Sequence, residues 1–140
     1  MNGKKLALGL GAVAAAMGAG LYYALVFAWH EPVDGLPSVA VAGVDVAVSD
    51  YRGLDGAASP LKLRACFTVD PALIVGPAAD KPTPLVAPGW FACFDAGALG
   101  AALERGEARA VVAETAPAGF ARIVAVFPDG RAYMWRQVVE

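Results

Sequence analysis

The hydrophobic pattern separates an apolar N-terminal run from a long remainder in which apolar and polar positions alternate. Residues 6–29 contain no charged side chain and follow Lys4 and Lys5. A helix rises about 1.5 Å per residue and the hydrocarbon core of a bilayer is roughly 30 Å thick, so this run is long enough to span a membrane. We therefore predict a transmembrane anchor over residues 1–30, with the two lysines on the cytoplasmic side and the rest of the chain outside.

A cleaved signal peptide is the alternative interpretation of this run. Val26, Phe27 and Ala28 place short apolar side chains where a signal peptidase inspects the chain. The apolar core of a signal peptide is normally about 7 to 15 residues long, whereas this run continues through Leu21 and Leu25. Its length favours a retained anchor.

Small residues recur at four-residue spacing along two rows of the predicted helix. The rows are Ala7, Gly11 and Ala15, and Ala12, Ala16 and Gly20. Such rows let two helices approach closely, because lipid provides no hydrophobic force between helices and their association depends on packing. The first row predicts a helix-packing surface, and the alternative is that an alanine-rich helix simply faces lipid.

After the anchor the pattern becomes extended. Two prolines and a glycine leave residues 31–38 no room for a helix, so we expect an extended linker there. Residues 39–48 place valine at alternate positions, with an irregularity at Gly43. This pattern indicates one kinked strand or two short strands.

The following segment alternates between turn-forming and strand-forming residues. Residues 50–60 are rich in turn-forming types, so we expect a loop. Residues 61–67 alternate strictly, which predicts a strand with Phe67 on its apolar face and Arg64 and Cys66 on the other.

The middle of the chain predicts one long excursion and one helix. Residues 70–89 contain five prolines, which block both a helix and a central strand, so we expect a surface segment. Asp95 precedes residues 96–105, whose alanines and spaced leucines predict a helix that Asp95 caps. A further strand is expected over residues 108–114.

The C-terminal end shows the clearest supersecondary signal. Two strand-forming runs, residues 122–127 and 131–138, flank the turn sequence Pro128, Asp129, Gly130, which predicts a β-hairpin. The elements together predict an α+β fold over residues 39–140, with a mainly antiparallel sheet of about five strands and one packed helix.

The two cysteines predict a disulfide. Cys66 and Cys93 both follow the anchor and leave no third thiol, and a single pair in an oxidising compartment is most simply a disulfide. Their spacing matches neither a Cys-x-x-Cys redox centre nor a haem attachment motif. We predict no metal site and no cofactor.

Charge and residue content narrow the function. The part beyond the anchor has all thirteen acidic residues but, without Lys4 and Lys5, only nine of the eleven basic ones, so nothing suggests nucleic acid as a partner. The one histidine, His30, lies at the predicted membrane edge, and no serine stands in a Gly-x-Ser-x-Gly turn. We predict no catalytic residue.

Large aromatic residues remain as candidates for a core or a contact surface. They are Trp90 and Phe91 beside Cys93, and Tyr133 and Trp135 on the last strand. Alternation places Tyr133 and Trp135 on one face, opposite Met134. The face that meets the helix is expected to be core, and a ring left outside would be a natural protein anchor.

Four runs carry a resemblance to a known family: residues 59–67, 87–95, 98–104 and 126–131. With these runs the chain resembles an uncharacterised family of alphaproteobacterial single-pass membrane proteins. Some members of that family are labelled histidine kinases, but this sequence has no nucleotide-binding glycine box to support the label. The resemblance implies a compartment and a topology, and it assigns no catalytic residue.

These observations favour a non-enzymatic accessory protein of the bacterial inner membrane with a periplasmic domain. The expected partners are the membrane lipid and a larger membrane-protein complex, for instance a respiratory one. The alternative is a sensor of a small ligand or of the envelope, which would need a concave apolar pocket with converging polar groups. A pocket that gathers Arg64 or Asp95 would favour the sensor, and an open aromatic patch would favour docking.

Overall fold

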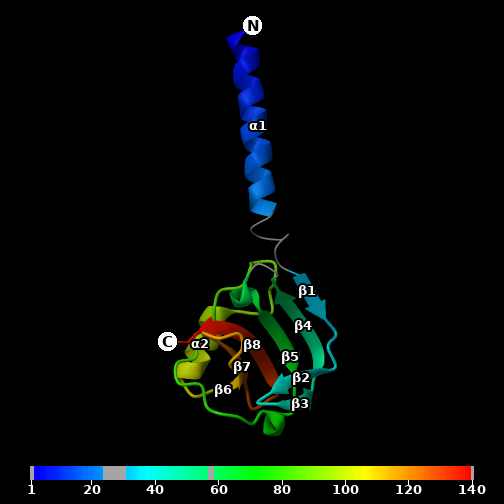
Figure 1. Cartoon of the computed structure of the whole chain (residues 1–140), viewed down its shortest axis with the longest axis vertical. Coiled ribbons are helices and arrows are strands. Elements are labelled where there is room, and N and C mark those ends of the chain that lie inside the picture. Colours follow the sequence, from blue (N-terminus) through cyan, green and yellow to red (C-terminus); the bar gives the residue numbers. More distant parts are fainter. Residues whose placement is uncertain (1, 24–30, 57–58, 140) are drawn as a thin grey trace.

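The computed structural model describes residues 2–23, 31–56 and 59–139. Within these residues the first element is a helix, and eight strands, two short 3-10 turns and a second helix between β5 and β6 follow (Figure 1). The elements are α1 (Gly3–Tyr23), β1 (Glu31–Asp34), β2 (Ser38–Val41), β3 (Val44–Ala47), β4 (Ser49–Asp55), η2 (Pro60–Lys62), β5 (Arg64–Thr68), η3 (Pro71–Leu73), α2 (Ala96–Glu104), β6 (Arg109–Glu114), β7 (Phe120–Val126) and β8 (Arg131–Val138).

Helix α1 stands apart from the strands, and none of its residues is buried (Figure 1). Its 21 residues are long and apolar enough to cross a membrane. The expected anchor extends to residue 30, and its last part, with Trp29, His30 and the cleavage alternative at Ala28, lies outside the described residues.

Six strands form one antiparallel sheet in the order β1-β4-β5-β8-β7-β6, and β2 and β3 form a separate hairpin. This confirms the α+β class, while six strands replace the five that the sequence suggested. The hairpin between β7 and β8 is confirmed, with Val126 paired to Ala132 across the turn. Residues 39–48 form two short strands joined at Ala42 and Gly43, whose positive φ values of 51° and 83° suit a two-residue hairpin turn.

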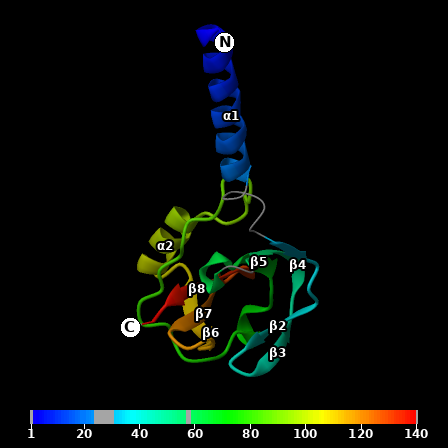
Figure 2. The same cartoon turned by 45° about the horizontal axis from the view of Figure 1, so that its top comes forward.

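Both faces of the large sheet are covered (Figures 1 and 2). On one face the β2–β3 hairpin and Ile74 pack over Phe67, Val124 and Met134. On the other face α2 and the segment before it pack over Ile123 and Trp135. The domain therefore has two apolar clusters, separated by the sheet.

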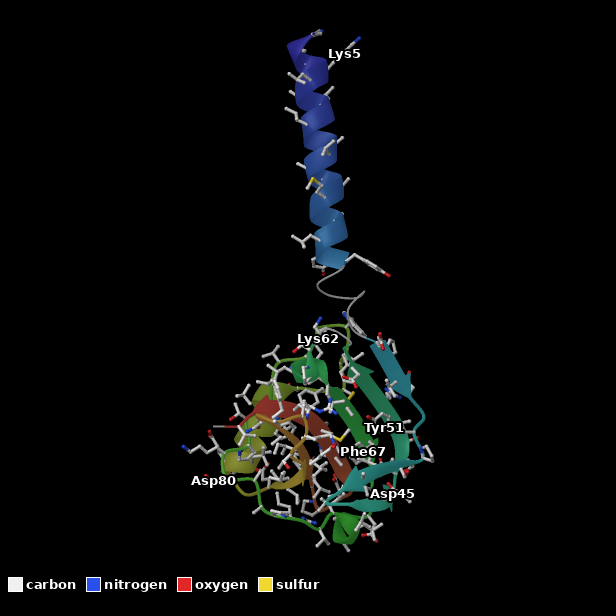
Figure 3. All side chains as sticks on the ribbon, viewed as in Figure 1. Lys5, Asp45, Tyr51, Lys62, Phe67 and Asp80 are labelled. Carbon is white, nitrogen blue, oxygen red and sulfur yellow. A yellow bond between two sulfur atoms is a disulfide. The ribbon has the colours of Figure 1, made fainter. Side chains whose placement is uncertain are left out.

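The expected loop over residues 50–60 is wrong for its first half, because strand β4 occupies Ser49–Asp55. Its turn-forming residues serve a bulged strand: Asp50 adopts a φ of 53°, and the register shifts between Ser49 and Arg52. Gly53 makes room for a neighbouring ring, since a Cβ there would lie 2.8 Å from Tyr51 Cε1. That ring stacks on Phe67 with 5.8 Å between centroids (Figure 3).

The expected linker over residues 31–38 is extended, but its first half is part of the sheet. Glu31 pairs with Asp55 and Asp34 pairs with Arg52, so β1 is an edge strand. An edge strand tolerates Pro32, which has no N–H to donate. The chain therefore joins the sheet as soon as the described part resumes at Glu31.

The expected surface excursion over residues 70–89 and the helix after it are confirmed. Residues 77–79 pair with the outer edge of β6, where Val112 N donates to Pro77 O at 2.8 Å. Asp95 Oδ1 accepts from Ala98 N at 3.0 Å and caps α2. Gly106, with a φ of 73°, follows the end of α2.

The predicted disulfide joins Cys66 of β5 to Cys93, 27 residues further on. It ties the centre of the sheet to the segment that enters α2. Closing a loop of this length stabilises the folded state by about 3–4 kcal/mol, through restriction of the unfolded chain.

We expect that reduction will lower the free energy of unfolding by about that amount, measured by denaturant titration with and without dithiothreitol. A Cys66→Ala, Cys93→Ala variant should be equally destabilised and should no longer respond to the reductant. Thiol labelling of the unfolded, unreduced protein should find no free thiol, and two reactive thiols would contradict the bridge.

Candidate functional site

The aromatic residues proposed for a contact surface divide into buried and exposed members. Trp135 has no exposed surface and Phe91 is buried in the same cluster. Phe94 meets Trp135 edge to face at 6.3 Å, and Trp135 Nε1 donates to Gln137 Oε1 at 2.9 Å. Trp135 and Phe91 are therefore corrected as contact-surface residues. Trp135 is core, as expected for the face that meets the helix, and Phe91 packs in the same cluster.

Tyr133 and Trp90 differ from these two. Tyr133 is partly buried and meets Phe94 edge to face at 6.1 Å. Trp90 is 39% exposed, which makes it the most exposed of the four rings. The sequence correctly placed Tyr133 and Trp135 on one face, opposite Met134, because strand alternation depends on the backbone alone.

Arg64 is the residue whose role the sequence did not reveal. Its side chain was expected on the polar face of β5, yet the residue is buried. Its Nε donates to Leu85 O at 3.0 Å and its Nη2 to Val86 O at 3.2 Å. Its Nη1 donates to Leu63 O at 2.6 Å and also contacts Leu61 O.

The guanidinium of Arg64 therefore joins the start of β5 to the proline-rich segment at residues 85–86. It also lies over the ring of Phe94, with Cζ 5.9 Å from the centroid. Burial lowers its pKa to about 10, since a dehydrated guanidinium is less favourable when charged. At neutral pH it stays protonated and donates to backbone carbonyls in two segments, at residues 61 and 63 and at residues 85 and 86.

A second guanidinium, Arg122, is buried on the opposite face of the sheet. Its Nη2 donates to Ala40 O at 2.7 Å and its Nε to Glu114 Oε2 at 3.2 Å, which ties the β2–β3 hairpin to β7 and β6. Beside it, a hollow of about 210 Å³ is lined by Tyr51, Arg136 and Ser38 among others. Burial raises the pKa of the Tyr51 phenol.

This hollow carries balanced charge. Arg136 Nη1 lies 3.9 Å from Asp55 Oδ1, as Arg122 lies beside Glu114. Arg136 Nε is the one buried side-chain polar atom without a hydrogen-bond partner among the described residues. The arrangement holds strands together, and its acids offset the attraction that two arginines would exert on an anion.

Another hollow, of about 620 Å³, lies on the face that α2 leaves partly open. Its floor includes Val112 and Ile123, and its rim includes Asp80, Lys81 and Gln137. The Gln137 amide is already engaged: Oε1 accepts from Thr83 N at 2.8 Å and Nε2 donates to Lys81 O at 2.9 Å.

Within the described residues no group of three or more histidine, cysteine, aspartate or glutamate side chains is placed to hold a metal ion. Asp95 is used as a helix cap, and Ser59 Oγ accepts from Leu61 N at 3.2 Å to begin η2. His30 lies outside the described residues. The expected lack of catalytic residues, metal and cofactor stays a prediction.

The predicted helix-packing row on α1 is open along its whole length. Ala7, Gly11 and Ala15 are all exposed. A Cβ added at Gly11 or Gly20 would meet no atom within 4 Å. Nothing in the described domain therefore explains why these positions carry small residues.

Fold and site together define a small, disulfide-bonded α+β domain that follows a helix long and apolar enough to cross a membrane. The family model of DUF6446, a family of unknown function, matches residues 36–140, and the chain belongs to this family. No curated protein and no solved structure matches it. The match begins between β1 and β2, so it covers the domain from β2 onward and leaves α1 and the edge strand β1 outside.

Replacing Arg64 tests its structural role. Arg64→Met keeps much of the volume but removes every donor to residues 61, 63, 85 and 86, so we expect a loss of about 2–4 kcal/mol in the free energy of unfolding. Arg52→Met is the control, because Arg52 is an exposed arginine on the neighbouring strand. It should change stability by less than about 0.5 kcal/mol. Equal effects of both variants in denaturant titration would refute the role.

Proposed function

We propose that this protein is a non-enzymatic accessory protein of a bacterial inner membrane, with its domain in the periplasm. In this role α1 docks to a larger membrane complex, such as a respiratory one, and holds the domain beside it. The observation that carries the proposal is the exposed row of small residues on α1, which has no packing partner among the described residues of this chain.

The location is supported by two independent features. A disulfide indicates an oxidising compartment, which in a bacterium is the periplasm. Lys4 and Lys5 precede the apolar helix, and positive charge next to a span favours the cytoplasmic side. The domain on the far side of α1 then reaches the compartment in which its disulfide forms.

The sensor alternative receives less support. Arg64 and Asp95 do not meet in one pocket: Arg64 binds backbone carbonyls, while Asp95 caps α2 and lies beside a hollow of about 230 Å³ whose Arg105 and Arg131 are paired with Glu107 and Asp129. The hollow at Tyr51 has its arginines offset by Glu114 and Asp55. The four aromatic residues named above do not form an open aromatic patch either. The docking proposal therefore rests on α1 and not on an aromatic surface of the domain.

Bulky substitutions in α1 test the docking. Gly11→Leu with Ala15→Leu should release the membrane partner, since large side chains prevent close helix approach. The measurement is mass spectrometry of proteins that copurify from native membranes in mild detergent. The matched control is Gly9→Leu with Val13→Leu, which changes the opposite face of the same helix and should retain the partner.

The docking proposal would be abandoned if the wild-type protein migrated alone after gentle extraction. It would also be abandoned if both double variants lost the same partners, because that result would indicate a general defect in insertion. A Cβ at position 11 meets no atom within 4 Å in the described structure, so the substitution introduces no backbone-proximal clash within this chain.

The orientation is tested with reporter fusions. A fusion at Glu140 should make alkaline phosphatase active, because that enzyme needs the oxidising periplasm to form its disulfides. The same fusion to green fluorescent protein should be dark when exported through the general secretory route. The opposite pair of results would place the domain in the cytoplasm.

A further inference from the structure

We propose that residues 85–90, here called the tip, insert into the headgroup region of the same bilayer that α1 spans. The partner is therefore a lipid surface, and the side chains that enter it are Val86 and Trp90. The inference rests on the proposed anchoring by α1, and it adds a second contact that fixes the domain against the membrane.

The first step is position. β1 begins at Glu31, which pairs with Asp55 at the end of β4. The next residue, Gly56, lies against the side chain of Lys62, since a Cβ at position 56 would fall 2.4 Å from Lys62 Cδ. Arg64 then binds both Leu61 O in this turn and Val86 O in the tip.

These contacts place the tip at the end of the domain where the chain arrives from α1. Figures 1 and 2 both show the yellow-green loop at this end, and Figure 3 labels Lys62 beside it. Seven residues separate Tyr23 from Glu31, and an extended chain spans at most about 3.6 Å per residue, so Glu31 lies within about 29 Å of the end of α1. The tether keeps this end close to the bilayer.

The second step is chemistry. Residues 82–90 contain no charged side chain. Val86 is 83% exposed, more than any other large apolar residue that the structure describes, and Trp90 is 39% exposed. Tryptophan is enriched at membrane interfaces because its ring is amphipathic. Exposed apolar side chains at a membrane-proximal end lower their free energy by entering the interface.

The third step is how the tip is held. A loop of this kind has few ladder bonds, and Arg64 provides two donors to its residues 85 and 86. Cys93 anchors the same segment just beyond Trp90. The backbone is therefore fixed on both sides, and the Val86 side chain points away from the protein. Glu31 and Asp55 lie at the same end and offset the charge of Lys62, so the contact depends on apolar insertion and not on attraction to anionic lipid.

The test uses the full chain in phosphatidylcholine vesicles. Because the two native cysteines are joined, a single added thiol can carry an environment-sensitive nitrobenzoxadiazole label. Val86→Cys places the label on the tip. Val75→Cys is the matched control, since Val75 is 70% exposed and follows Ile74, whose carbonyl binds Arg109 on the sheet edge opposite β1.

The label at position 86 should shift its emission to shorter wavelength in vesicles and be quenched by lipids that carry a nitroxide near the headgroup. The label at position 75 should do neither, and salt should not reverse the effect. Equal emission at both positions, with the chain floating with the vesicles and resisting carbonate extraction, would overturn the tip contact and leave the anchoring intact.

Two other outcomes would also overturn the tip contact. A chain that carbonate releases from the vesicles would refute the anchoring by α1, and the tip contact with it. A label at position 86 that is shielded only after proteins of the native membrane are added would overturn lipid insertion in favour of a protein contact.

Discussion

The structure depends on covering both faces of one sheet with very little chain. β5 and β8 form its centre, and most of their residues are buried or half-buried. One cover is the β2–β3 hairpin, which Arg122 ties down through Ala40. The other cover is mostly irregular, since α2 has only nine residues. That irregular cover needs cross-links in place of ladder bonds, and Arg64 and the disulfide provide them.

This requirement explains why an arginine is buried beside the disulfide. A proline-rich segment has few N–H groups and leaves carbonyls without partners. One guanidinium can bind several of them at once, and its fixed planar geometry defines their positions. The energetic cost of dehydrating the charge appears in the lowered pKa of Arg64. A lysine would bring the same charge without the fork of donors.

The sequence predicted the elements whose pattern is local and missed those that depend on distant contacts. The β7–β8 hairpin and the capped helix α2 follow from turn and capping residues near them. Strand β4 does not, because Asp50 and Gly53 are turn-forming types that here serve a bulge and a ring from Tyr51. Alternation gave the face of Trp135 but not its burial, which α2 determines.

The site was harder to predict for the same reason. The alternation of residues 61–67 put Arg64 on a polar face. Arg64 is buried because residues 85–86, about twenty positions later, fold back against it. The same return places an uncharged loop at the end of the domain where the chain arrives from α1. The hydrogen bonds from Arg64 to residues 85 and 86 thus have two effects. They hold this segment over the face of Trp135, and they keep Val86 exposed to solvent. In a tethered domain, where orientation relative to the membrane is otherwise free, such a fixed apolar loop limits how the domain can turn.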